Sequence, residues 1–174
     1  MTRRRWLLGL LGLLATLMMT PPAFAFNFVP AERPAAPEIS FLDGDGEEVT
    51  LADFSGRIVV LNLWATWCAP CRREMPSLEN LAASFADEDL AVVALSQDRG
   101  DARDKIDAFY EEVGVDGLEV YRDPEARTAR DLRAPGLPTT IIFDRSGREV
   151  GRVLGDAEWD GEEALELLRL LVEE

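Results

Sequence analysis

Hydrophobic residues follow two alternating patterns along the chain: continuous apolar runs and runs with helical spacing. Residues 58–64 are apolar except for Asn62, and such a run is typical of a strand buried on both faces. Residues 72–85 instead place apolar side chains three and four positions apart, which predicts an amphipathic helix. Similar patterns predict strands at 90–95, 118–121, 140–143 and 149–154, and helices at 101–113, 125–132 and 159–172.

The order of these elements indicates an α/β fold. Ahead of the first buried strand, residues 41–51 carry apolar ends around Asp-Gly turn residues and predict a β-hairpin. Strands that then alternate with helices predict a mostly parallel sheet with helices on both faces. The last two strands are joined by a tight turn at 144–147 and must run antiparallel, so the predicted sheet is mixed.

The N-terminal segment has the features of an export signal. Arginines at 3–5 precede an uncharged, mostly apolar run at 6–19, and residues 23–25 form a small-x-small cleavage site. We therefore predict export with cleavage after Ala25. An uncleaved membrane anchor is the alternative, because no charge follows the arginines until Glu32.

The chain therefore divides into three predicted parts. Residues 1–25 form the signal peptide or anchor, and residues 26–37, rich in proline and alanine, are predicted to be a linker. Residues 38–174 have a length that suits one domain with one hydrophobic core. Export places this domain outside the reducing cytosol, where a cysteine pair is either a structural staple or a redox catalyst.

Composition excludes several kinds of chemistry. The chain has 18 basic and 33 acidic residues, for a net charge of −15, which argues against binding to nucleic acids or anionic membranes. The absence of histidine excludes Ser-His-Asp and Cys-His catalysis and His-based zinc or copper sites. Two cysteines cannot close a structural zinc site, so we expect neither a metal nor another cofactor.

The remaining chemistry is concentrated in Cys68 and Cys71, which follow the first buried strand at the start of a predicted helix. Cysteines with this spacing can form a disulfide. Free N–H groups at a helix N-terminus favour a thiolate, so Cys68 is expected to be the nucleophile and Cys71 the resolving thiol. A purely structural bridge is disfavoured because so short a loop restricts the unfolded chain little. Trp64 is predicted to lie in the core and Trp67 to form part of the surface around the nucleophile.

Two segments carry a resemblance to a known family. Residues 61–76, which include the Cys-Ala-Pro-Cys sequence at 68–71, resemble the active-site segment of the TlpA/ResA/CcmG group of exported thioredoxin-like proteins. Residues 137–139 resemble the second signature of that group, a proline that precedes a strand. The resemblance extends from about Pro37 to the C-terminus. It implies a thioredoxin-like α/β fold with a central mixed β-sheet flanked by helices, an N-terminal β-hairpin and a central β/α insertion.

The resemblance also implies roles for individual residues. Pro138 would be a cis-proline beside the disulfide, and the backbone of Leu137 would pair with the substrate chain as a strand does. Thioredoxin keeps a buried aspartate at the position of Asn62, and asparagine cannot take a proton. Members of the group carry a glutamate that resembles Glu74. A carboxylate there can accept the proton of Cys71, the alternative being an ordinary exposed helix residue.

For function, the resemblance implies an extracytoplasmic protein disulfide reductase. Its substrates would be exported proteins, among them apocytochrome c or copper-assembly proteins of respiratory oxidases, and its electron donor a membrane thiol transporter. The dipeptide Ala69-Pro70 resembles the Gly-Pro of reducing members. An oxidase or isomerase with the same fold stays open, because sequence alone does not give a redox potential.

Two other classes of protein are alternatives. A peroxiredoxin has threonine three residues before its reactive cysteine and proline further upstream, where this chain has Ala65 and Leu61. A thioredoxin-like copper chaperone needs a histidine in addition to two cysteines, and the chain has none. Met75 is a soft ligand, but its spacing predicts that it faces the core.

Overall fold

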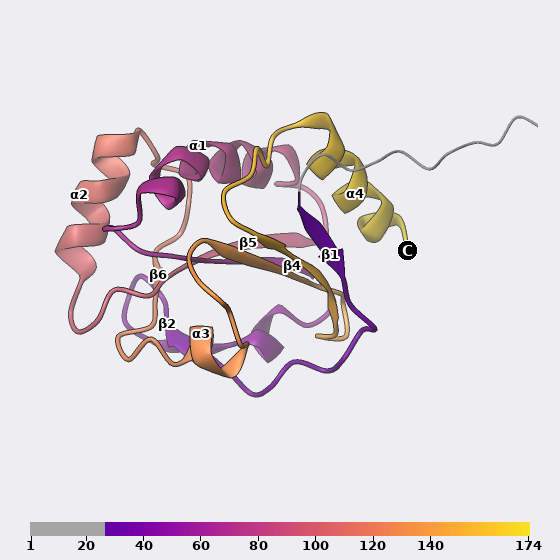
Figure 1. Cartoon of the computed structure of the whole chain (residues 1–174), viewed down its shortest axis with the longest axis horizontal. Coiled ribbons are helices and arrows are strands. Elements are labelled where there is room, and N and C mark those ends of the chain that lie inside the picture. The colour runs from indigo at the N-terminus through magenta and orange to yellow at the C-terminus, as the bar shows by residue number, and fades with distance from the viewer. Residues whose placement is uncertain (1–26) are drawn as a thin grey trace, which may run out of the picture.

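A mixed eight-stranded sheet forms the centre of the part of the chain that the computed structural model describes, residues 27–174 (Figure 1). The export signal or anchor predicted at 1–25 lies outside these residues. The sheet has the strand order β1-β8-β7-β4-β5-β6-β2-β3. Its strands are β1 (Phe28–Pro30), β2 (Ser40–Leu42), β3 (Glu48–Thr50), β4 (Ile58–Trp64), β5 (Leu90–Ser96), β6 (Tyr121–Arg122), β7 (Thr139–Phe143) and β8 (Glu149–Leu154).

Helices cover both faces of this sheet, as the sequence pattern predicts. Helices α1 (Ala69–Ser84), α2 (Arg103–Val113) and α4 (Glu162–Glu173) pack on one face. The 3-10 turn η1 (Leu51–Phe54) and the short helix α3 (Thr128–Asp131) lie on the other (Figure 1). Each residue of β4 is buried, because side chains alternate between the two apolar clusters on either side of the strand.

The expectation of a mostly parallel sheet is wrong. Among the strand pairs of residues 27–174, β4–β5 and β5–β6 are parallel and the other five are antiparallel. Alternation with helices fixes strand direction only where a helix carries the chain back to the opposite end of the sheet. The helix α3 is four residues long, and the chain enters β7 from the end at which β6 stops. The carboxyl end of β4 and the start of β7 therefore lie together.

The prediction that residues 26–37 form a linker is also wrong. Strand β1 pairs antiparallel with β8, with Phe28 opposite Val153, and Ala35 forms a further bridge with Arg148. This segment satisfies backbone groups that β8 would otherwise expose at the edge of the sheet. Prolines are tolerated there because an edge strand needs hydrogen bonds on one side alone.

The predicted N-terminal hairpin is confirmed, since Ser40 of β2 pairs with Thr50 of β3. The strand predicted at 118–121 is shorter and later, at Tyr121–Arg122. The closing helix begins at Glu162 rather than at 159, which leaves a loop at 155–161 beside the start of β7. Within residues 27–174, none of the helices combines the length and the apolar character needed to cross a membrane.

Candidate active site

Cys68 and Cys71 form a disulfide at the junction between β4 and α1, with an S–S distance of 2.03 Å and a Cα–Cα distance of 5.3 Å. Cys68 is the N-cap residue of α1, and the backbone N–H of Cys71 donates to Cys68 Sγ over 3.3 Å. No acidic residue occupies the first turn of α1, so nothing there opposes the positive end of the helix dipole. Pro70 lies in this turn, where its missing N–H costs no hydrogen bond. The helix start thus favours a thiolate at Cys68.

The turn before Cys68 is held by the two residues that follow β5, Gln97 and Asp98. Asp98 accepts hydrogen bonds from the backbone N–H and the hydroxyl of Thr66, both over 2.8 Å, and it is itself buried. The N–H of Gln97 donates to the carbonyl of Trp64 over 2.8 Å. These bonds hold Trp64 and Thr66, which precede the nucleophile, and so keep the sulfur in one place relative to the sheet.

The two tryptophans have the environments expected from the sequence. Trp64 is fully buried, and its ring packs against Phe109 and Tyr110 of α2. Trp67 is 71% exposed, directly beside Cys68 in the chain. A large apolar side chain so exposed is available to a partner protein. Cys68 retains 5% exposure, while Cys71 is completely buried, so an incoming substrate can reach the first sulfur more readily than the second.

The Leu137–Pro138 peptide bond is cis, as the resemblance implies. Pro138 immediately precedes β7, whose first residue Thr139 is paired with Leu63 near the end of β4. The register thus brings Pro138 to the carboxyl end of β4, where the cysteines lie, although it is 67 residues away from Cys71 in the sequence. The carbonyl of Pro138 accepts from the N–H of Gly155 over 3.0 Å.

Glu74 is a buried residue, 2% exposed, and not an ordinary surface residue of the helix. Its Oε1 accepts a hydrogen bond from Asn62 Nδ2 over 2.8 Å. Its Oε2 accepts from the N–H of Ala157 over 3.2 Å and from Trp159 Nε1 over 3.3 Å. Burial raises the pKa of Glu74 to about 7, against the lowering effect of these three donors. A carboxyl group with this pKa can take up and release a proton near neutral pH.

The sequence does not predict the hydrogen bonds that three groups donate to Glu74. Asn62 is recognisable as a residue that cannot take a proton, but no local pattern indicates its bond to Glu74. Ala157 and Trp159 reach Glu74 from the loop at 155–161, more than 80 positions away in the chain. The sequence offers one indication of the contact with Trp159. A tryptophan that is buried near a helix start has an indole N–H that needs an acceptor.

The raised pKa of Glu74 makes stability depend on pH. The folded protein binds this proton more tightly than the unfolded chain, so the stabilising effect is complete below about pH 4.5 and is lost as pH rises through about 7. Glu74→Gln removes the titration. The free energy of unfolding of the wild type, relative to that of the variant, should therefore fall by up to about 3 kcal/mol between about pH 4 and pH 8. Chemical denaturation of both oxidised proteins measures this, and a difference independent of pH would contradict it.

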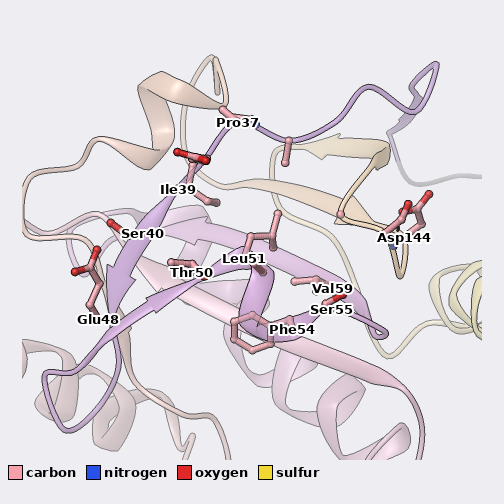
Figure 2. A pocket seen from close by; sticks show the side chains of 15 residues that line it. Pro37, Ile39, Ser40, Glu48, Thr50, Leu51, Phe54, Ser55, Val59 and Asp144 are labelled. Carbon is pink, nitrogen blue, oxygen red and sulfur yellow. Dashed lines mark hydrogen bonds between the residues drawn. The ribbon is translucent and has the colours of Figure 1, made fainter.

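A cavity of about 630 Å³ lies at the opposite end of β7 from Pro138. Figure 2 shows its apolar floor at Ile39, Leu51 and Phe54 and the carboxylate of Asp144 at its rim. Neither the cysteines nor Glu74 contribute to its lining, so the thiol chemistry takes place elsewhere, at the molecular surface. Within residues 27–174, no group of three or more His, Cys, Asp or Glu side chains is placed to hold a metal ion.

The fold and the Cys68–Cys71 disulfide at the start of α1 define a thiol–disulfide oxidoreductase with a thioredoxin-like fold. The profile of the AhpC/TSA family matches residues 33–148, and the chain belongs to that family. Thioredoxin-like protein YneN of Bacillus subtilis (strain 168) is 38% identical over 117 residues, which are 67% of each chain. The thiol-disulfide oxidoreductase ResA of Bacillus anthracis is 30% identical over 121 residues, 70% of this chain and 68% of ResA.

Solved structures agree with this class. The crystal structure of a thiol:disulfide interchange protein, DsbE, from Chlorobium tepidum superimposes with a TM-score of 0.69 at 30% identity. The match covers 82% of this chain and 97% of that one. The thioredoxin-like α/β fold and the resemblance to the ResA group are thereby confirmed, and the chain is an enzyme of the thiol–disulfide oxidoreductase class.

Proposed function

We propose that this protein reduces disulfides of exported proteins through the Cys68–Cys71 dithiol. The observation that carries the proposal is a buried carboxylate, Glu74, one helical turn beyond the buried sulfur, with a pKa near 7. The ionised carboxylate of a group with this pKa can accept the proton of a buried thiol that must attack a mixed disulfide. The dipeptide Ala69-Pro70 resembles that of reducing members of the group, which supports reduction rather than oxidation of the substrate.

The reaction begins with the reduced enzyme. The thiolate of Cys68 attacks one sulfur of a substrate disulfide, which forms a mixed disulfide and expels the other substrate sulfur as a thiolate. Cys71 then transfers its proton to ionised Glu74 and attacks Cys68 Sγ, which breaks the mixed disulfide. The second substrate sulfur leaves as a thiolate, and both substrate sulfurs are protonated in neutral solution. Two electrons have passed to the substrate, and the enzyme holds the Cys68–Cys71 disulfide.

Substrate docking is assigned to Trp67, Leu137 and Pro138. Trp67 provides exposed apolar surface next to the nucleophile. Leu137 precedes the cis bond, and its backbone is proposed to pair with an extended stretch of the substrate in the manner of an added strand. Pro138 presents no backbone N–H beside the sulfurs. A substrate held in this way would place its disulfide in front of Cys68.

We also propose an extracytoplasmic location, on the basis of the N-terminal sequence. Residues 1–25 would direct export, with cleavage after Ala25 or retention as a membrane anchor. A membrane thiol transporter would return electrons to the enzyme. Apocytochrome c and copper-assembly proteins of respiratory oxidases are the proposed substrates, because the active-site segment at 61–76 resembles proteins of cytochrome c maturation and copper-site assembly.

The proposal is tested with the reduced, purified protein and four reactants in parallel. An oxidised peptide with a Cys-x-x-Cys-His sequence and a disulfide-bonded copper-assembly protein should each be reduced, with formation of the enzyme disulfide. Hydrogen peroxide should be consumed slowly in comparison, and cuprous ion should bind weakly. Fast reaction with peroxide would favour the peroxidase alternative, and tight copper binding by the dithiol would favour the chaperone alternative.

A further inference from the structure

One polar side chain interrupts the apolar strand β4. Asn62 is completely buried, and its neighbours in the strand, Leu61 and Leu63, are buried as well. An amide in such a position is expensive unless it is hydrogen-bonded. A leucine there would serve the core better, so the asparagine calls for an explanation other than packing.

The amide group of Asn62 bridges two elements of the active site. Its Nδ2 donates to Glu74 Oε1 and to Thr140 Oγ1, both over 2.8 Å. Thr140 is the residue of β7 directly opposite Asn62, two positions after Pro138. The amide oxygen Oδ1 has no hydrogen-bond partner among the described residues. The amide is thus oriented so that its N–H groups form hydrogen bonds, while its oxygen accepts none from the described residues.

We propose that Asn62 is a positioning residue that holds the carboxylate of Glu74 in place for proton exchange with Cys71 and ties it to the strand that starts at the cis-proline. This inference deepens the proposed function and rests on the role given there to Glu74. Asn62 itself exchanges no proton and touches no substrate. It acts by donating a hydrogen bond to the ionised form of Glu74, which favours that form.

The other groups around Glu74 define what Asn62 contributes. From the loop at 155–161, Asp156 disfavours ionisation of Glu74, and Arg73 binds Asp156 over 2.8 Å. The same loop supplies the neutral donors described above. On the side of the sheet, Asn62 and Thr140 are neutral, and Cys71 lies one turn earlier on α1. No cation forms a salt bridge with Glu74 in the described part of the chain, so hydrogen bonds provide the stabilisation of its charge.

The test compares Asn62→Leu and the shape-matched Asn62→Asp with the wild type, and uses Thr140→Val as the control. Carbon-13 NMR of the side-chain carboxyl of Glu74, assigned with Glu74→Gln, follows its titration in the oxidised proteins. Loss of one hydrogen bond to a charged group should raise the midpoint by about one pH unit in Asn62→Leu. A second carboxylate should raise it further in Asn62→Asp. Thr140→Val keeps the bond to Glu74 and should shift the midpoint by less than about a third of a unit.

The rate at which the mixed disulfide is resolved provides the second readout. In both Asn62 variants its pH midpoint should rise with the carboxyl titration. For Asn62→Leu, a rise of about one unit from about 7 corresponds to a roughly fivefold lower rate at pH 7. A merely structural role would lower the rate equally at every pH. An unchanged carboxyl midpoint would overturn the inference about Asn62 alone. A shifted carboxyl midpoint with an unchanged rate profile would overturn the proton-transfer role of Glu74, and with it the positioning role. Asn62→Asp keeps the test decisive if Asn62→Leu fails to fold.

Discussion

Replacement of Cys68 by serine is expected to lower the rate of disulfide reduction on the order of 10³-fold or more, because the attacking thiolate is lost. Serine has nearly the same size, so the turn that Asp98 holds through Thr66 should persist. Cys71 cannot substitute for the missing nucleophile because its sulfur is completely buried. The rate is measured by stopped-flow mixing of the reduced protein with an oxidised Cys-x-x-Cys peptide.

Cys71→Ser is the matched control for that experiment. It retains the more accessible sulfur, that of Cys68, and should attack the substrate at close to the normal rate, but it cannot resolve the product. A mixed disulfide between Cys68 and the peptide should accumulate and be detected by mass spectrometry. If instead Cys68→Ser accumulated the mixed disulfide and Cys71→Ser did not, the assignment of attacking and resolving thiols would be reversed.

Glu74→Gln is expected to slow resolution of the mixed disulfide by about 10²- to 10⁴-fold, the usual contribution of a positioned proton acceptor. In the wild type this rate should rise with pH and level off above about 7, because the ionised carboxylate accepts the proton. The variant should lose this rise. Rapid quenching at a series of pH values, starting from the preformed mixed disulfide, measures the step directly.

Glu79→Gln provides the control on the same helix. Glu79 accepts hydrogen bonds from backbone N–H groups of the loop after α2, at Asp116 and Gly117, and lies away from the sulfurs. Its replacement should leave the pH profile of resolution unchanged. A profile in Glu74→Gln that still rises through pH 7 would show that another group accepts the proton of Cys71.

Much of the site could be predicted from local sequence. The cysteine pair after a buried strand locates the nucleophile at a helix N-terminus, because the strand, the cysteines and the helix follow one another directly in the sequence. Glu74 could be placed near Cys71 because residues three apart lie on one face of a helix. The predicted burial of Met75 and Trp64 is also confirmed, since both are completely inaccessible to solvent.

The remaining features depend on pairing between distant segments. The antiparallel pairing of β7 with β4 and the docking of β1 on β8 join segments far apart in the sequence, and no local pattern reveals them. The bond between Asn62 and Glu74 requires α1 to pack over β4 in one register. Likewise, Trp159 reaches Glu74 because the last helix starts late and leaves a loop over the site. For these reasons the environment that sets the pKa of Glu74 could not be derived from spacing.

The reduction potential of the Cys68–Cys71 pair tests the central claim most directly. It is measured by equilibrating the purified protein with defined ratios of reduced and oxidised dithiothreitol or glutathione and quantifying the free thiols. A strongly reducing value, near the roughly −270 mV of thioredoxin, is the predicted result for a reductase of exported proteins. A value near the roughly −120 mV of a strong dithiol oxidant would contradict it, and would mean that the same two cysteines introduce disulfides instead.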